Sequence, residues 1–235
     1  MNTVMIQLSV FGSFGSIVPE SENLISLMKS LKGFIPGSLK SLSINALSGQ
    51  IESANRIQMA NSESGWRIDF QVDRTDVIYS KPISQDGLEF LEGQVAEGLD
   101  ILSKAFDAIS IIPEFSRLAI NAQFVKVTGK EKPKIPFITS LPSYIESDKG
   151  IKEWNITLNR AGNVTIDSEE KTNELLTCSL AHAATDPSQN AILFTLDINT
   201  IAENTTRRFS IEQYKTFLDY GIQRMDTMLN DFREK

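Results

Sequence analysis

The sequence predicts an α+β protein in which one unit of strands and helices occurs twice. Long amphipathic helices are indicated at 86–109 and 210–232, and several short alternating apolar segments precede each of them. The order of elements is similar in the two halves, 1–111 and 112–235, so we expect them to form one pseudo-symmetric domain. Each half would contain a strand, a helix, four short antiparallel strands and a long helix.

The first half begins with a strand at 4–10, where apolar residues alternate with more polar ones until Gly12. A short helix at 20–32 follows, with Ser21 as the expected N-cap and Gly33 as the C-terminal stop. Turn residues then separate four expected strands, at 39–47, 51–60, 65–72 and 75–80.

The connections between these strands contain typical turn residues. Pro36 and Gly37 precede the first strand, Ser48-Gly49 and 61–65 are expected hairpin turns, and 73–76 is a tight polar turn. In the strand at 65–72 the apolar residues share one face, with Trp66 at the rim or in the core. The pattern predicts an antiparallel sheet with one polar face.

From residue 86 the apolar period becomes helical. The apolar stripe consists of Leu88, Leu91, Val95, Leu99, Leu102, Phe106 and Ile109. Glycines at 87, 93 and 98 each lower the helix propensity by about 1 kcal/mol, so packing on a sheet must hold the helix together. Glycines on one side of the helix would also allow close contact with a neighbour.

The second half begins with a strand from Leu118 to Phe124. The segment 129–142 contains several prolines and lysines and is expected to be an exposed loop, and 141–148 is expected to be a short helical turn. Four strands follow, at 152–159, 163–168, 174–183 and 191–199. The last helix starts with a capping-box pair, Ser210 and Gln213, which fixes its beginning.

This order of elements is that of the TATA-binding-protein-like fold, to which the chain is similar at the level of fold. In that fold two halves join edge to edge into one curved antiparallel sheet, with the long helices on its convex face. The similarity implies an open concave surface. It does not imply a function.

Two stretches resemble a sporadically distributed family of uncharacterised bacterial proteins of similar size. They are Arg56–Tyr79, with R-I-Q-M followed by G-W-R-I-D-F-Q-V-D-R-T-D-V-I-Y, and Leu193–Phe232, with L-F-T-L-D-I-N-T before the long helix. The resemblance implies a place in bacterial operons, including defence loci. It supplies no catalytic residues.

Composition favours a cytoplasmic protein that needs no disulfide. A chain of 235 residues can bury a sufficient core, and its single cysteine, Cys178, cannot form an internal bridge. The segment 1–18 has no basic residue and is interrupted by polar residues, unlike a signal peptide, and no segment reaches the roughly 18 apolar residues of a membrane span. The net charge of −7 argues against attraction of nucleic acid by the molecule as a whole.

No catalytic or metal-binding pattern is present in the sequence. His182 is the only histidine, and the spacing along a strand keeps it from pairing with Ser179 or Cys178 as a base with a nucleophile. Cys178 lies in an apolar strand, where a buried and inert thiol is expected. The acidic residues at 73–76 and 167–170 are typical of solvated turns. We therefore expect no enzyme, no metal and no cofactor.

Two sets of residues are candidates for contacts with partners. Basic residues for contact with nucleic acid are Lys126, Lys130, Lys132, Lys134, Arg207 and Arg208, with solvated loop residues as the alternative interpretation. Trp66 and Trp154 are first interpreted as packing residues and second as contacts for a protein partner.

These observations favour a non-enzymatic binding or assembly module of a bacterial cytoplasmic system. It would engage another protein or a second copy of itself through the exposed sheet face or a helix surface. A nucleic-acid-binding saddle is one alternative, and an enzyme of unrecognised type, whose side chains converge only in the fold, is the other.

Overall fold

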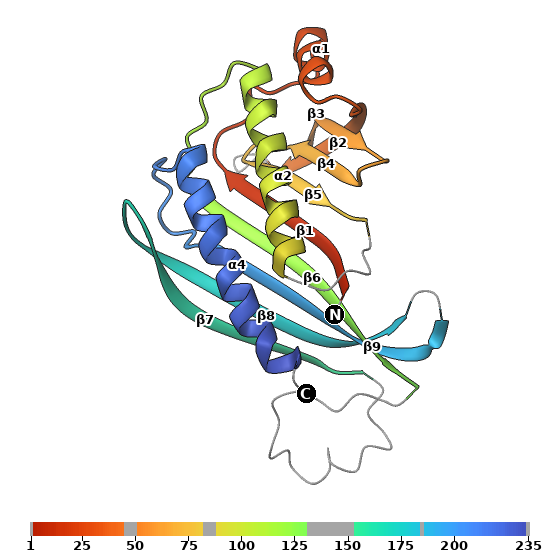
Figure 1. Ribbon diagram of the computed structural model, residues 1–235. Coiled ribbons are helices and arrows are strands. Elements are labelled where there is room, and N and C mark those ends of the chain that lie inside the picture. Colours follow the sequence, from red (N-terminus) through yellow and green to blue (C-terminus); the bar gives the residue numbers. More distant parts are fainter. Residues whose placement is uncertain (1, 45–50, 82–87, 131–152, 184–185, 234–235) are drawn as a thin grey trace.

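The computed structural model describes residues 2–44, 51–81, 88–130, 153–183 and 186–233 (Figure 1). The elements of the first half are β1 (Asn2–Phe11), α1 (Ser21–Ser30), β2 (Ile35–Ile44), β3 (Ile51–Asn61), β4 (Trp66–Phe70), β5 (Arg74–Tyr79) and α2 (Leu88–Ala108). The elements of the second half are β6 (Arg117–Gly129), β7 (Asn155–Ile166), β8 (Ser168–Ala183), β9 (Asp186–Thr200) and α4 (Ile211–Arg233).

Within the described ranges, nine strands form one curved antiparallel sheet in the order β2-β3-β4-β5-β1-β6-β9-β8-β7 (Figure 1). The first strands of the two halves, β1 and β6, are neighbours, with Leu8 opposite Ile120. The last strands of the two halves, β5 and β9, flank this pair. The predicted α+β class and the single curved antiparallel sheet are confirmed, whereas the TATA-binding-protein-like duplication stays a prediction.

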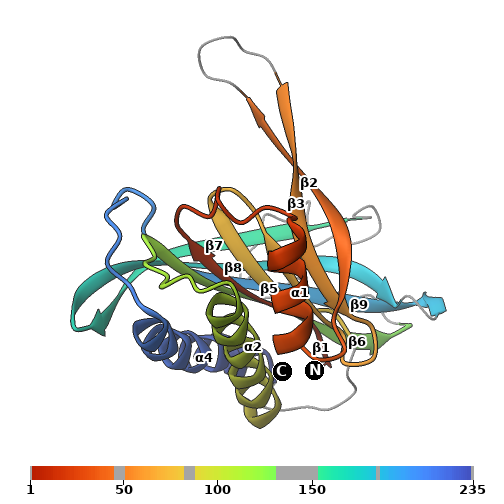
Figure 2. The same cartoon turned by 90° about the horizontal axis from the view of Figure 1, so that it is seen from above.

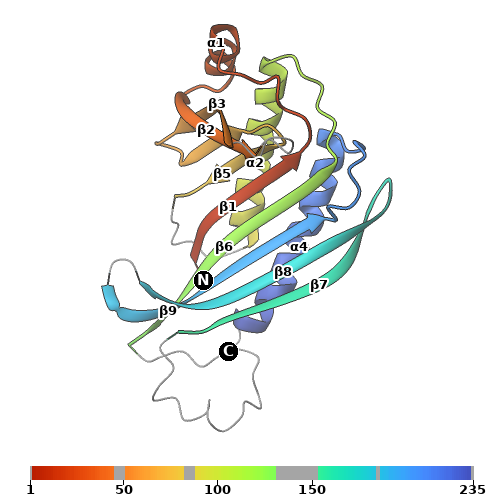
Figure 3. The same cartoon turned by 180° about the vertical axis from the view of Figure 1, so that it is seen from behind.

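The described helices α1, α2 and α4 lie on one face of the sheet (Figure 2). None of these helices lies over the strands on the other face, which is seen from behind in Figure 3. The long helices α2 and α4 lie side by side and run in opposite directions (Figure 1). No helix in the described part of the chain is both long and apolar enough to cross a lipid bilayer.

The core lies between the sheet and the helices. Alternation along β1 directs Ile6, Leu8 and Val10 toward the helices, and all three side chains are fully buried. Phe106 of α2 packs against Phe14 and Phe115, with ring centroids 5.6 and 5.9 Å apart. Of the stripe predicted for α2, Leu91, Val95, Leu102 and Phe106 are buried as expected, whereas Leu99 and Ile109 are half-buried.

In the described part of the second half, the four strands predicted after β6 are represented by three, β7, β8 and β9. The segments expected at 152–159 and 163–168 form one strand, β7, whose register with β8 shows no shift. The residues between the two segments include Gly162, which stays within the strand because glycine does not by itself require a turn. The chain instead reverses at Asp167, whose φ of 55° is one that aspartate tolerates.

Three local predictions in the first half were wrong. The N-cap of α1 is Glu20, not Ser21, because the Glu20 carbonyl already accepts the first helical hydrogen bond. Pro36 lies inside β2 rather than before it, since an edge strand tolerates a residue without an N–H group. The turn expected at 73–76 lies earlier, because β5 already begins at Arg74.

The turn at 61–65 is confirmed. The Gly65 N–H donates to the Asn61 carbonyl at 2.9 Å, and the Asn61 side chain accepts from two further backbone N–H groups of the turn. The Ser48-Gly49 turn, the helical turn at 141–148 and most of the loop at 129–142 lie outside the described residues.

Candidate functional site

A groove runs between α2 and α4 on the helix face of the molecule. It encloses a volume of about 650 Å³. Its floor is formed by Val95, Leu218 and Ile222, which are at most 4% exposed, and half-buried Leu99 and Ile211 line its sides. The floor of the groove is therefore buried, and Leu99 and Ile211 supply partly exposed apolar surface at its sides that no other described element covers.

Acidic side chains dominate the border of the groove. Glu92 and Asp100 of α2 and Asp219 of α4 line it, against Lys215 as the basic lining residue. Asp100 also pairs with Lys104 at 2.5 Å, and both side chains of this pair are about half exposed. Because Lys104 offsets Asp100 and Lys215 offsets a second carboxylate, the border of the groove has a small negative excess.

The opposite face of the sheet is polar and is cross-linked by its own hydrogen bonds. The Asp76 carboxylate accepts from Ser9 Oγ at 2.5 Å, from Gln7 Nε2 at 3.0 Å and from Gln71 Nε2 at 3.0 Å. Asp69 lies opposite Asp76 on β4, and burial raises the pKa of Asp69. A partner on this face would have to replace bonds that the protein already makes.

The candidate nucleic-acid residues do not form one cluster. The structure describes Lys126, Lys130, Arg207 and Arg208, while Lys132 and Lys134 lie outside the described residues. Arg208 contacts Ser116 just before β6, whereas Lys126 lies ten positions later near the other end of that strand. Ten strand residues span about 30 Å, so the arginines and lysines are far apart. The nucleic-acid alternative stays a prediction.

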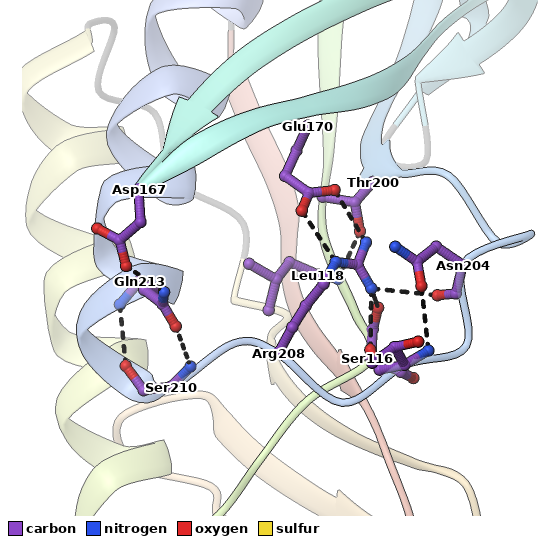
Figure 4. A network of polar contacts seen from close by, with 10 residues as sticks. Ser116, Leu118, Asp167, Glu170, Thr200, Asn204, Arg208, Ser210 and Gln213 are labelled. Carbon is purple, nitrogen blue, oxygen red and sulfur yellow. Dashed lines mark hydrogen bonds and ion pairs between the residues drawn. The ribbon is translucent and has the colours of Figure 1, made fainter.

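Arg208 is held by the protein itself (Figure 4). Its guanidinium forms a bidentate ion pair with Glu170 of β8, with N–O distances of 2.9 and 3.0 Å. It also donates to the carbonyls of Ser116, Asn204 and Thr206. Arg208 therefore fixes the connection between β9 and α4 to strands β6 and β8.

The predicted capping box lies beside this arginine (Figure 4). The Ser210 N–H donates to Gln213 Oε1 at 2.7 Å, and the Gln213 N–H donates to Ser210 Oγ at 3.4 Å. The Gln213 side chain also donates to the carboxylate of Asp167 at the reversal between β7 and β8. These contacts position the first turn of α4, from which Ile211 enters the groove.

The two tryptophans have different environments. Trp66 is 1% exposed beneath α2, so it lies in the core rather than at the rim and is not accessible to a partner. Its ring lies 5.1 Å from that of Tyr79. Trp154 is half-buried and lines a second cavity, of about 450 Å³, together with His182. A partner contact through Trp154 stays a prediction.

Cys178 and His182, the side chains considered for catalysis in the sequence, both lie on β8. Cys178 is 1% exposed, and burial raises its pKa to about 12, which keeps the thiol protonated. His182 is exposed, lies four positions from Cys178 along β8 and is the register partner of Asn190 on β9. Within the same residues, no three histidine, cysteine or acidic side chains gather as metal ligands do.

A buried ion pair fastens α4 to β8. Glu174 is 2% exposed and accepts from Arg224 at 2.9 and 2.8 Å and from Tyr220 Oη at 2.5 Å. Burial acts to raise the pKa of Glu174, but the hydrogen bonds from Arg224 and Tyr220 outweigh it, and the pKa is lowered. Gly162 of β7 makes room, since a Cβ there would lie 2.6 Å from Glu174 Oε1.

Comparisons of the chain with protein-family models, with curated proteins and with solved structures find no match. The assignment of a function therefore depends on the geometry of this chain.

Sequence reasoning missed the groove because it assigned the whole apolar stripe of each long helix to the sheet. Leu99 belongs to that stripe, yet it is half-buried and lines the groove. The usable signal was a pair of small residues seven positions apart on α2, Ala96 and Ser103, which lie beside the stripe and line the groove.

Proposed function

We propose that the protein is a non-enzymatic binding module of a bacterial cytoplasmic system, and that it engages another protein through the groove between α2 and α4. The observation that carries the proposal is the apolar lining of that groove, in which half-buried Leu99 and Ile211 border a buried floor. Each Å² of apolar surface removed from water stabilises a complex by about 25 cal/mol before the costs of association.

The proposed occupant is an amphipathic helix with basic residues beside its apolar stripe. Two antiparallel helices border the groove, and a third helix fits such a site with apolar residues at positions i, i+3, i+4 and i+7. Lysine or arginine next to this stripe would meet Glu92, Asp100 and Asp219 on the border. The polar sheet face is a poorer binding surface, because donors such as Ser9 and Gln7 already form hydrogen bonds with Asp76.

We also propose that the two halves share the TATA-binding-protein-like duplication. The pairing of β1 with β6, the position of β5 and β9 on either side, and the helix after each of these last strands support this. In this arrangement the groove lies between equivalent helices of the two halves.

The test uses the purified products of genes that neighbour this one. Binding is measured by size-exclusion chromatography with light scattering for the unmodified protein and for Ala96→Arg, which fills the groove from an exposed position. Glu97→Arg is the matched control, because Glu97 is exposed on the same helix but does not line the groove. A complex that survives Glu97→Arg and is lost in Ala96→Arg supports the proposal. A complex unaffected by Ala96→Arg, or a monomer with none of these products bound, contradicts it.

A further inference from the structure

The strand β7 forms an open edge of the sheet. It is the last strand in the sheet order, and no described residue pairs with its outer side. Most of its 12 residues are exposed, and its register with β8 is regular along its whole length. Every second residue of such a strand directs its N–H and C=O groups outward, where another strand can bind them.

The two edges of the sheet differ in how they resist strand pairing. The edge strand β2 contains Pro36, which lacks an N–H group, and the exposed Lys40. The strand β7 contains no proline and no lysine, it has no bulge, and Arg160 is its one charged residue. Natural proteins commonly block exposed edges by proline, bulges and charged side chains, and of these β7 has only the charge of Arg160.

The side chains of β7 on the helix face border a small cavity next to α4. The cavity has a volume of about 230 Å³ and is lined by Leu158, Asn159, Arg160, Glu174, Leu176, Arg224 and Met228. Leu158 is 45% exposed at its mouth. Arg224 forms a bidentate ion pair with Glu174. Arg160 is exposed, lies opposite Glu174 in the register of β7 with β8, and interacts with the Glu174 carboxylate electrostatically. The edge thus offers an apolar contact and an exposed guanidinium two residues apart.

We propose that β7 is a strand-addition site for an extended acidic segment of a partner protein. The partner's backbone pairs with the outer edge of β7. On the helix face, an apolar side chain of the partner packs against Leu158, and an Asp or Glu two residues away pairs with Arg160. This site is separate from the groove between α2 and α4, so the inference goes beyond the proposed function.

A second copy of this chain is a poorer occupant of the same edge. The strand β7 contains no aspartate or glutamate, so pairing of β7 with β7 of another copy would leave Arg160 without an acidic partner from that strand. A register centred on residue 160 would place the two arginines opposite each other, which is destabilising. Charge complementarity therefore selects a different, acidic strand.

The first experiment selects binders from a library of random dodecapeptides displayed on phage, with the full chain as the target. We expect the enriched peptides to have the alternating pattern of a strand, with an apolar residue and an acidic residue two positions apart on the same face. When the Arg160→Glu variant is used as the target, the selected peptides are expected to carry a basic residue in place of the acidic one. The matched control is Arg207→Glu, which reverses the charge of another exposed arginine and is expected to keep the acidic preference.

The second experiment tests backbone pairing with the best enriched peptide. Two N-methylated versions are made, one methylated at odd positions and one at even positions, and their affinities are measured by fluorescence anisotropy. Only one edge of the peptide faces β7, so one version is expected to lose binding and the other to keep it. Arg160→Glu is expected to weaken the unmodified peptide about fivefold, and Ala96→Arg in the helix groove is expected to have no effect.

Several results would overturn this inference. They are enrichment of no peptide, peptides without a charge preference, an unchanged preference in Arg160→Glu, or equal binding of the two N-methylated versions. A concentration-dependent dimer that Arg160→Glu strengthens would also overturn it, in favour of self-pairing. Because the groove variant Ala96→Arg is measured in parallel, failure at β7 is distinguishable from failure of the groove proposal.

Discussion

Leu8 of β1 and Ile120 of β6 are register partners in the sheet, and each lies beneath a helical glycine. A Cβ atom at Gly98 of α2 would lie 2.7 Å from Leu8 Cδ1, and one at Gly221 of α4 would lie 2.7 Å from Ile120 Cγ2. Real Cβ atoms do not approach other atoms so closely. Because these two positions lack a side chain, α2 packs closely on Leu8 of β1 and α4 packs closely on Ile120 of β6.

Alanine at either glycine is expected to destabilise the protein. Gly98→Ala and Gly221→Ala should each lower the free energy of unfolding by about 2 kcal/mol, because the buried neighbours must shift and this outweighs the better helix propensity of alanine. Urea denaturation measures the effect. Gly93→Ala is the control, since a Cβ there meets nothing within 4 Å, and it should raise stability by up to about 1 kcal/mol. Equal stabilisation by Gly93→Ala and Gly98→Ala would contradict the close-packing argument.

Residues with a regular apolar period were predictable from the sequence. The alternation of Ile6, Leu8 and Val10 and the helical stripe of α2 indicate both the element and its buried face, because burial of one face imposes the period. The break expected between strands at 152–159 and 163–168 was wrong, because no apolar period marks where a strand ends. A turn needs a residue whose backbone reverses the chain, and that residue is Asp167, not Gly162.

The candidate sites were less predictable, because they depend on pairs of elements that are distant in sequence. The groove requires the spacing between α2 and α4, which no single helical pattern contains. The open edge of β7 requires the strand order, which sets β7 last although it lies in the middle of the second half. Arg208 is a further example. Its partner Glu170 lies on β8, distant in sequence, and the ion pair between them could not be predicted from either residue alone.

The carboxyl group of Asp69 is expected to reduce stability as pH rises. Burial raises its folded pKa above the usual value of 3.8, so the folded protein binds this proton more tightly than the unfolded chain does. The stabilising effect is fully present below 3.8 and is lost as pH rises through the folded pKa. Compared with Asp69→Asn, the unmodified protein should therefore lose stability as the pH rises from below 3.8 through the folded pKa, measured by urea denaturation at each pH. A constant difference across this range would contradict the prediction.

Glu174 should show the opposite pH dependence. Its folded pKa lies below the usual value of 4.5, so its contribution is present above that value and is lost as pH falls through the folded pKa. Glu174→Gln should lower the free energy of unfolding by about 2 kcal/mol near neutral pH, because Arg224 loses its charged partner. The decrease should be smaller at acidic pH. Asp69→Asn serves as the comparison, since the two variants should differ in the sign of their pH dependence. The same sign for both would contradict these assignments.

Arg208 and its neighbour Arg207 are expected to differ in their effect on stability. Arg208→Ala should lower the free energy of unfolding by about 3 kcal/mol, because it leaves the carboxylate of Glu170, which is 12% exposed, without its partner. Arg207 is exposed, and Arg207→Ala should change stability by no more than about 0.5 kcal/mol. Urea denaturation of both variants provides the measurement. Similar small effects would show that Arg208 does not anchor the connection to α4.

The thiol of Cys178 is expected to react only when the protein opens. Burial raises its pKa to about 12, so at about pH 8 roughly one thiol in ten thousand is ionised, and the side chain is also 1% exposed. Labelling with a thiol reagent should be more than about a hundredfold slower in the native protein than in urea. A Ser13→Cys variant supplies an exposed thiol that should react rapidly in the native state. Rapid native labelling of Cys178 would mean that the contact between β8 and the helix layer opens readily, and the assignment of this residue to the core would be wrong.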